Sequence, residues 1–387
     1  MMKVTFFFNY LNHHQVLVAD AMYELLGDDF IFVATYPCDP KELKGGLDYS
    51  TRPYCILATK SNELNFKAHK LNIESDVCVF GAGNLEWEKE RASTEKLSFE
   101  VSERWLKKGW RNLFSPRLLK WWWLYQTLFR NKPFYRLCCS AFTANDDVKL
   151  RCYKGRHFKW GYFTQVDERN YVEASLDVST PGSTTLMWCS RFLVWKHPEL
   201  PVQMAAKLKD KGYKFHIRMY GDEGNAAKHD TIYPRKKLQK LIEQLGVQDC
   251  VELMGSRPNN EVLDAMRESE IFLFTSDRQE GWGAVANESM ANGCALVASD
   301  AIGSVPYLID ENRNGLIFHT GDVDSLYSKV KYLLDNPDIC KCMAKTARQS
   351  MVDIWSPVNA AKSLLTLIDD LQREQECSIL KGPCSKA

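Results

Sequence analysis

The stretch from Glu270 to Gly293 constrains the fold more than any other part of the chain. It begins with a short apolar and aromatic run, Glu270-Ile-Phe-Leu-Phe-Thr275, which predicts a buried strand. A polar, glycine-bearing loop follows over 276–283, and residues 284–292 are good helix formers that end at Gly293. A strand, loop and helix in this order are typical of parallel sheets, which bind ligands at the carboxyl ends of their strands.

Two acids of this unit, Glu280 and Glu288, lie eight residues apart on the loop and the predicted helix. Gly281 and Gly283 allow a ligand to approach the backbone closely. The two carboxylates can accept hydrogen bonds from two sets of hydroxyl groups, one on a sugar and one on a ribose. The pattern therefore suits a sugar nucleotide, although for an isolated pair two solvated surface acids are the plainer interpretation.

Other predicted strands also end in polar or glycine-bearing loops. Arg191 and Lys196 follow an apolar run that begins at Leu186, and the strands at 214–220 and 251–254 are followed by turns at 221–224 and 255–258. A guanidinium and an ammonium beside a diphosphate can neutralise it and stabilise it as a leaving group. Taken alone, two basic loop residues are usually only surface.

Four motifs now stand in a fixed order along the chain. They are Arg191 with Lys196, Gly221-Asp222-Glu223-Gly224, Val251-Glu252-Leu253-Met254-Gly255, and Glu280 with Glu288. In this order they resemble the retaining GT-B glycosyltransferases of family 4 (group 1), and the similarity extends to about Leu371. The resemblance implies an α/β fold of two Rossmann-like, doubly wound parallel-sheet domains that face a cleft, with a C-terminal helix that returns to the N-terminal domain.

The resemblance also implies roles for individual residues. Glu288 would hold the ribose hydroxyls, while the catalytic group of Arg191, Lys196 and Glu280 would contact the diphosphate and the donor sugar. Further donor-binding positions would be Gly281, Trp282, Gly283 and Ala284, with Ser256 and Arg257 beside the base. The chain departs from the family pattern at Tyr307, which stands where many members have an acid.

The N-terminal half predicts a parallel sheet of its own, with strands at 3–8, 30–34 and 75–80. We expect an acceptor-binding domain over 1–168, a linker over 169–184, a nucleotide-sugar domain over 185–355, a closing helix over 356–373 and a flexible tail over 374–387. The acceptor candidates are Asn12, His13, His14 and Glu103. An equally good alternative for one of the two histidines is that it packs against the helix that follows. For Glu103 the plainer interpretation is an acid at the start of a helix.

The segment from Arg104 to Arg136 holds nine Lys or Arg residues, ten aromatic residues and no acid. Basic stretches with Trp and Phe suit an anionic membrane surface, which predicts peripheral attachment and access to a lipid-linked glycan. Three alternatives remain: a helix with a core of aromatic residues, a groove for a phosphorylated acceptor, and a nucleic-acid patch. The net charge of +1 makes nucleic acid the least favoured partner.

Composition bounds the remaining classes. The 387 residues suit two domains. The thirteen cysteines lack zinc-ligand spacing, which indicates reduced thiols of a cytoplasmic protein, and the segment 104–136 adds the expectation that this protein is peripheral at the inner membrane face. No run approaches the ~18 apolar residues of a spanning helix. Asp322-Val-Asp324 is best explained as a helix start, so we expect no metal and no cofactor.

The sequence as a whole predicts an enzyme that moves a hexose-type unit from a UDP- or GDP-sugar to an acceptor hydroxyl with retention. We expect it to work in the assembly of a surface polysaccharide or another glycoconjugate, with a glycan or lipid-linked glycan as the acceptor. Two alternatives remain: a catalytically silent subunit that binds a sugar nucleotide or glycan, and a GT-B sugar-nucleotide epimerase. The loop at 9–15 is not glycine-rich, which keeps the silent subunit open.

Overall fold

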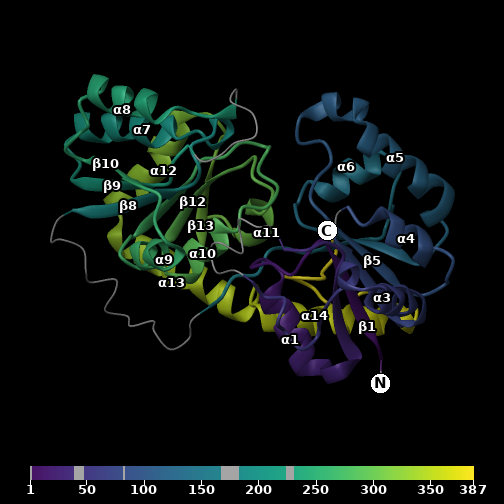
Figure 1. Ribbon diagram of the computed structural model, residues 1–387. Coiled ribbons are helices and arrows are strands. Elements are labelled where there is room, and N and C mark those ends of the chain that lie inside the picture. Colours follow the sequence, from purple (N-terminus) through teal and green to yellow (C-terminus); the bar gives the residue numbers. More distant parts are fainter. Residues whose placement is uncertain (1, 39–47, 82, 167–182, 224–230) are drawn as a thin grey trace. The chain divides into compact units, whose positions relative to one another are not determined.

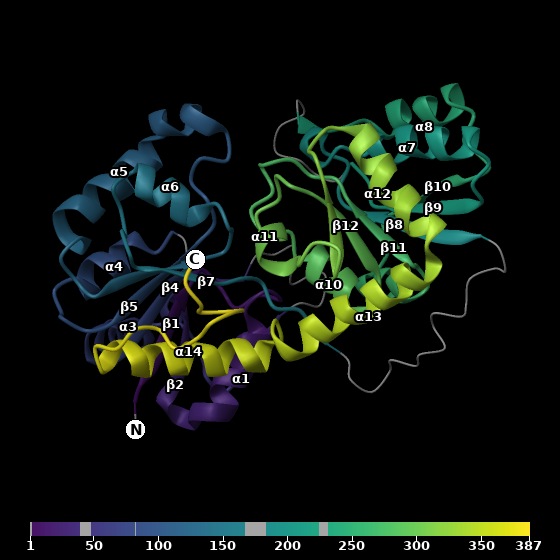
Figure 2. The ribbon, with the colours of Figure 1, turned by 180° about the vertical axis from the view of Figure 1, so that it is seen from behind.

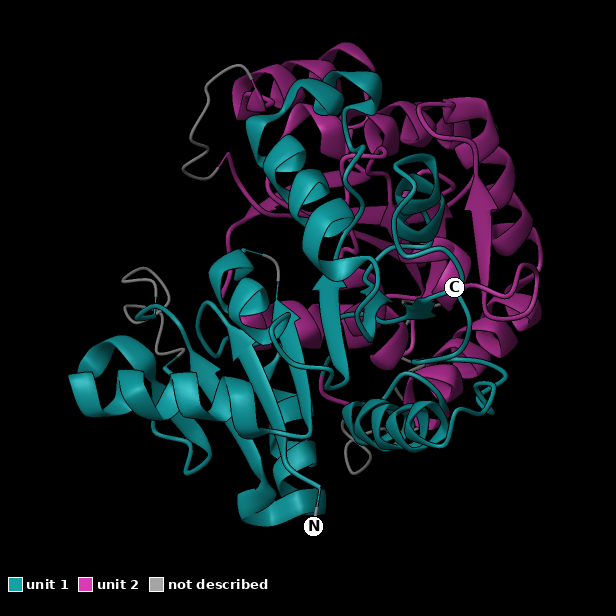
Figure 3. Ribbon diagram, turned by 90° about the vertical axis from the view of Figure 1, so that its right-hand side faces the viewer, with its two compact units in different colours: residues 1–164, 354–387 teal, residues 165–353 magenta. Residues whose placement is uncertain are grey.

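The computed structural model describes residues 2–38, 48–81, 83–166, 183–223 and 231–387 (Figure 1). The chain divides into two compact units. Unit 1 comprises Met1–Thr164 and Ile354–Ala387, and unit 2 comprises Gln165–Asp353 (Figure 3). The greater part of the predicted linker, residues 169–182, lies outside the described residues.

Unit 1 is built on a seven-stranded sheet in the order β3-β2-β1-β4-β5-β6-β7, with every neighbouring pair parallel. The strands are β1 (Val4–Phe8), β2 (Phe30–Ala34), β3 (Cys55–Leu57), β4 (Val77–Gly81), β5 (Ser98–Ser102), β6 (Phe134–Cys138) and β7 (His157–Lys159). The central strands β1, β4 and β5 are buried along their whole length, as in a sheet covered on both faces. The strands predicted at 3–8, 30–34 and 75–80 are confirmed.

Helices cover this sheet, and the last long helix of the chain is one of them. They are α1 (Val16–Leu26), α3 (Asn62–Glu74), α4 (Leu85–Arg91), α5 (Pro116–Leu124), α6 (Thr143–Lys149) and α14 (Pro357–Gln372). Helix α14 packs beside α1 (Figures 1 and 2). The Ser356 hydroxyl caps it by accepting from the Asn359 amide at 3.3 Å. The predicted return of the C-terminal helix to the N-terminal domain is confirmed.

The prediction of a flexible tail over 374–387 is wrong. Cys384 is fully buried, and its amide donates to the Lys159 carbonyl at 2.7 Å, while the Lys159 amide donates to the Ser385 carbonyl at 2.8 Å. Strand β7 is an edge strand, and its unpaired backbone groups provide partners for the end of the chain. The polar composition of the tail gave no sign of this pairing.

Unit 2 is built on a six-stranded parallel sheet in the order β10-β9-β8-β11-β12-β13. Its strands are β8 (Thr184–Cys189), β9 (Phe215–Tyr220), β10 (Val251–Gly255), β11 (Ile271–Phe274), β12 (Ala295–Ser299) and β13 (Gly315–Phe318). Its helices are α7 (Glu199–Asp210), α8 (Arg235–Gln244), α9 (Asn259–Arg267), α10 (Val285–Ala291), α11 (Val305–Leu308), α12 (Val323–Asp335) and α13 (Pro337–Asp353). The strand and helix predicted around 270–292 correspond to β11 and α10.

Both sheets reverse their direction of growth once, between β1 and β4 in unit 1 and between β8 and β11 in unit 2. Two neighbouring strands at such a point send their following loops to opposite faces of the sheet, which leaves a crevice at their carboxyl ends. Each unit therefore has one place where its topology favours a ligand.

Candidate functional site

In unit 2 the predicted donor residues follow the two strands at the reversal point. Arg191 and Lys196 come after β8, and Glu280 comes after β11. Parallel pairing of β8 with β11 brings these loops to the same edge of the sheet. The two most informative motifs of the sequence are thus neighbours in space.

A buried ion pair between Lys196 Nζ and Glu280 Oε2 joins the two loops. The Ser276 hydroxyl donates to the same Glu280 oxygen at 3.0 Å. The Thr275 hydroxyl donates to the Lys196 carbonyl at 2.7 Å and accepts from the Trp188 indole at 2.8 Å. A buried charge pair of this kind needs such fixed surroundings, because desolvation opposes it.

Glu288 and Arg191, by contrast, carry no side-chain hydrogen bond or ion pair within the described parts of the chain. Glu288 is half-buried on α10, and burial raises the pKa of its carboxyl. Burial, together with the charge of Glu288, raises the pKa of Cys189 to about 12, which places Glu288 near the end of β8. Arg191 is exposed. This edge of the sheet therefore offers a ligand one carboxyl group that can accept hydrogen bonds, on Glu288, and one cation, Arg191.

Two glycines let the loops run close to the sheet. At Gly221 φ is +124°, and an added Cβ would lie 1.9 Å from the Ser190 carbonyl oxygen. At Gly283 φ is +79°, and an added Cβ would lie 2.3 Å from Phe274 Cζ. Side chains are excluded at both positions, since no other residue fits that space and that backbone conformation.

The remaining predicted donor residues have different surroundings. Trp282 is fully buried and donates to Asn287 Oδ1 at 2.8 Å, so its indole supports the loop from inside. Tyr307 lies against it, with ring centroids 6.2 Å apart. Ser256 and Arg257 are exposed after β10, the edge strand of the sheet. The half-buried Ala284 precedes α10.

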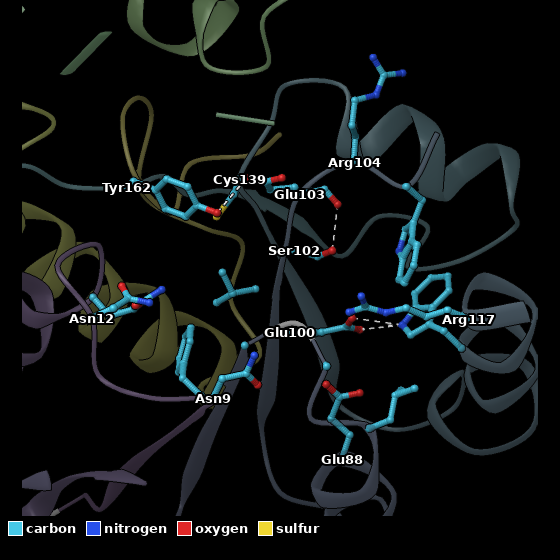
Figure 4. Close-up of a pocket in the computed structure, with 18 of the residues that line it drawn as sticks. Asn9, Asn12, Glu88, Glu100, Ser102, Glu103, Arg104, Arg117, Cys139 and Tyr162 are labelled. Atoms are coloured by element: carbon cyan, nitrogen blue, oxygen red, sulfur yellow. Dashed lines mark hydrogen bonds between the residues drawn. The ribbon is translucent and has the colours of Figure 1, made fainter. Parts of the chain in front are cut away.

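Unit 1 has a cavity of about 420 Å³ at its own reversal point, lined by residues that follow β1, β4 and β5 (Figure 4). Asn12 and Glu103 belong to the lining, as predicted for acceptor contacts, but His13 and His14 do not. His14 stacks on Tyr162 with centroids 4.6 Å apart, and burial, with the neighbouring His13, lowers its pKa to about 4. His14 is therefore packed against Tyr162, whereas the alternative expected packing against the helix that follows, α1.

Three further lining residues differ in how far the sequence indicated them. Glu88 is one acid among several charged residues of α4 and had no distinct signal. Gln15 belongs to the polar loop at 9–15, whose side chains can bond a sugar hydroxyl or a phosphate, and Trp105 belongs to the aromatic and basic segment 104–136. Arg117 also lines the cavity, although its segment was interpreted mainly as a membrane surface. Among the interpretations of that segment, only a groove for a phosphorylated acceptor predicts a ligand-binding role for Arg117.

The structure divides the aromatic and basic segment 104–136 between core and surface. Trp121 and Arg136 are buried, and both contact the Glu100 carboxylate, at 3.1 Å for the indole and 2.6 Å for the guanidinium. Trp110, Phe114 and Trp123 are exposed. Membrane association therefore cannot involve the whole segment, because its buried residues form part of the core of unit 1.

Within the described residues, no helix is long and apolar enough to cross a membrane. All thirteen cysteines are free thiols. Asp322 caps α12 by accepting from the amides of Asp324 and Ser325 at 2.8 and 3.0 Å, which confirms the helix-start interpretation of that acidic pair.

Comparisons with known proteins agree with this arrangement. Residues 179–350 match the family model described as Glycosyl transferases group 1. A D-inositol 3-phosphate glycosyltransferase of Corynebacterium urealyticum is 27% identical over 228 residues, 58% of this chain and 51% of that protein. A putative colanic acid biosynthesis glycosyltransferase, WcaL, of Salmonella typhimurium is 22% identical over 214 residues, 53% of this chain and 50% of that protein. The chain thus spans about half the length of these curated relatives.

Among solved structures, Anabaena Alr3699/HepE in complex with UDP aligns with a TM-score of 0.72 at 14% identity, over 96% of this chain and 100% of that one. At this identity the likeness shows the fold, two Rossmann-like parallel-sheet domains of the GT-B type. Residues 179–350 thus match the group 1 glycosyl transferases, glycosyltransferase family 4, which is the family that the sequence motifs resemble.

Proposed function

We propose that the protein is a retaining glycosyltransferase that moves a hexose-type unit from a UDP- or GDP-sugar to an acceptor hydroxyl. The observation that carries the proposal is the Lys196–Glu280 pair at the reversal point of unit 2. Glu288 and Arg191 lie at the same edge and have no ion pair among the described residues. Members of the family are retaining, and the printed names of the two relatives describe glycosyltransferases. HepE, which shares the fold, was solved with UDP.

The chemistry follows from the charges. The acceptor oxygen forms a bond to the anomeric carbon, the bond from that carbon to the diphosphate breaks, and the acceptor proton leaves with the diphosphate. Lys196 and Arg191 stabilise the negative charge that grows on the leaving diphosphate. Glu280 accepts a hydrogen bond from the sugar, and Glu288 accepts from the ribose. Because two cations perform the neutralisation, we expect activity without a metal ion.

Nucleotide binding tests the donor assignment. Titration calorimetry with UDP, GDP and ADP in EDTA should show binding of one uracil or guanine nucleotide. Glu288→Gln keeps the shape but removes the charge, and should weaken that binding by about tenfold, as loss of a charged hydrogen bond does. Glu261→Gln, an exposed acid on α9, is the matched control and should bind normally. Equal affinities in all three proteins would refute the role of Glu288.

Turnover separates the transferase from its alternatives. A transferase should release nucleoside diphosphate from the bound UDP- or GDP-sugar faster when an acceptor is added. Loss of the donor without any acceptor would favour an epimerase, and tight binding without turnover would favour a silent binding subunit.

We further propose that the protein acts at the cytoplasmic face of an anionic membrane, in the assembly of a surface polysaccharide or glycoconjugate. The supporting feature is a set of exposed residues of one segment, here called the aromatic patch: Trp110 and Phe114, whose ring centroids lie 6.0 Å apart, and Trp123, with the exposed cations Lys108 and Arg111. Exposed rings beside cations suit the interface of an anionic bilayer, where rings lie among head groups and cations meet phosphates.

Vesicle sedimentation tests the aromatic patch. Replacing Trp110, Phe114 and Trp123 by Ser should weaken binding to vesicles of phosphatidylglycerol and phosphatidylcholine by about tenfold or more, since three rings no longer bury apolar area. Phe66→Ser is a matched control, because Phe66 and Phe114 are both 73% exposed in unit 1. Full retention of vesicle binding in the triple variant would contradict the proposal.

A further inference from the structure

The cavity of unit 1 carries information about the acceptor. It lies where β1 and β4 diverge, the position at which a doubly wound sheet receives a ligand, and its volume of about 420 Å³ is enough for a sugar-sized molecule. The backbone of the β4 loop is open on this side, since an added Cβ at Gly83 would have only Arg117 Nη2 at 3.7 Å and Asn9 Oδ1 at 3.8 Å within reach.

Three buried polar atoms of the lining have no hydrogen-bond partner in the described chain. They are Glu88 Oε2, Gln15 Oε1 and Trp105 Nε1. Glu88 is only 1% exposed, and its side chain points up into the cavity in Figure 4. Buried groups of this kind are almost always satisfied in native proteins, so a partner from outside the chain is expected. A hydroxyl group both donates and accepts, and therefore suits all three.

Glu88 is also suited to a neutral ligand group. Burial, together with the charge of Glu100, raises the pKa of the Glu88 carboxyl well above its usual range. The protonated form is thereby favoured, and a protonated carboxyl can donate to one sugar oxygen while its carbonyl oxygen accepts from another hydroxyl.

Among the residues that the structure describes, one cation of the cavity lining has no counter-ion. The other cations of the lining are paired, Arg104 with Asp146 at 3.1 Å and Lys107 with Glu103, and the acid Glu100 is paired with Arg136 at 2.6 Å. Arg117 lies over the Trp105 ring, 5.9 Å from its centroid, and has no ion pair among the residues described. In Figure 4 the Arg104 side chain points away from the cavity, whereas Arg117 belongs to the cavity lining. A guanidinium in that position can hold a phosphate.

We propose that this cavity binds the acceptor as a phosphorylated polyol, with its hydroxyl groups against Glu88 and Gln15 and its phosphate against Arg117. The inference rests on the proposed transferase function and adds the chemical class of the acceptor. The phosphate could belong to a free sugar phosphate or to a lipid-linked sugar, and both present the same chemistry to the cavity.

Binding of defined probes to the full-length protein tests the proposal. The probes are glucose, glucose 1-phosphate and its octyl phosphodiester, octyl glucosyl phosphate, measured by titration calorimetry. We expect glucose 1-phosphate to bind at least about tenfold more tightly than glucose, because a charged hydrogen bond is added. A preference for the octyl ester would identify a lipid-linked source, and a preference for glucose 1-phosphate would identify a free sugar phosphate.

Two variants assign the contacts. Arg117→Gln should remove the advantage of glucose 1-phosphate over glucose, while Arg151→Gln, an exposed arginine outside the cavity lining, should retain it. Glu88→Gln should weaken glucose and glucose 1-phosphate by similar factors. Binding of UDP or GDP, measured in the same variants, shows whether the proposed donor site in unit 2 is intact.

The outcomes separate this inference from the proposed function. If a nucleotide binds but glucose and glucose 1-phosphate bind equally well or not at all, the acceptor class is wrong and the donor assignment survives. If Arg117→Gln leaves the preference for phosphate intact, Arg117 is not the phosphate contact. If no nucleotide binds, the proposed function itself fails.

Discussion

At the scale of single residues, Gly221 holds the loop that follows β9 against the loop that follows β8. Its amide donates to the Gly255 carbonyl at 2.9 Å, and its φ of +124° is open only to glycine. We expect Gly221→Ala to lower the free energy of unfolding by about 3 kcal/mol or more, since the strained backbone and a clash with the Ser190 oxygen add together.

Gly246→Ala provides the comparison for this prediction. Gly246 also has a positive φ, +64°, but an added Cβ there meets nothing within 4 Å. The Gly246→Ala variant should lose about 1–2 kcal/mol of unfolding free energy, which is the cost of a left-handed backbone alone. Urea unfolding followed by circular dichroism measures both, and equal losses would show that the contact with Ser190 is unimportant.

His197 should give the protein a pH-dependent stability. Hydrogen bonds to Asp277 and Glu199 raise its pKa to about 9, with Nδ1 of the ring 2.8 Å from Glu199. Because the folded pKa exceeds the unfolded value of about 6.5, this contribution is complete below pH 6.5 and is lost as pH rises through 9. The charged ring should contribute up to about 3 kcal/mol at low pH.

His197→Gln checks this expectation. The variant should lose stability relative to the natural protein at pH 6 and approach it near pH 9.5, as measured by urea midpoints across that range. A difference that is constant with pH would mean that the ring does not titrate between those values.

At the scale of elements, the end of the chain extends the sheet of unit 1 at β7. Three backbone hydrogen bonds join residues 384–387 to this strand, including one from the Ala387 amide to the His157 carbonyl at 3.2 Å. Deleting 381–387 should therefore lower the stability of unit 1 by about 2–4 kcal/mol, from about 1 kcal/mol for each bond and the burial of Cys384.

Leu380→Ser is the control for this deletion, since Leu380 is 94% exposed and should change stability by less than about 0.5 kcal/mol. The melting temperatures of the deletion variant and of Leu380→Ser, measured by thermal unfolding, distinguish these two effects. An unchanged melting temperature in the deletion variant would show that the terminal residues do not stabilise the sheet in solution.

Strands were the most predictable elements. Apolar runs such as 270–275 and 30–34 correspond closely to β11 and β2, because strands buried on both faces must be apolar throughout. The segment 104–136 was less predictable, since aromatic residues suit both a core and an interface. Its composition alone could not separate buried Trp121 from exposed Trp123.

At the scale of the whole molecule, the proposed donor site lies at the reversal point of the unit 2 sheet and the proposed acceptor site at that of the unit 1 sheet. Hydrogen exchange on the full chain should show this division. The preferred nucleotide should slow exchange of amides in the loops after β8 and β11, and glucose 1-phosphate should slow exchange after β1 and β4, since a ligand stabilises the loops that it contacts. Protection of the same unit by both ligands would contradict the assignment of two sites.

The sequence by itself determined the two parallel sheets, the returning helix and the donor motifs. Strand patterns and glycine turns are local, and the order of the motifs identifies the family. That Glu280 would pair with Lys196, 84 positions away, was not visible, because the pairing depends on β8 and β11 lying side by side.

The tertiary structure alone decided the composition of the unit 1 cavity. Glu88 differs from its neighbours on α4 only in being buried without a partner, and Arg117 differs from the other cations around the cavity only in lacking a counter-ion in the described chain. Burial and pairing arise from residues far apart in the sequence, so no local pattern encodes them.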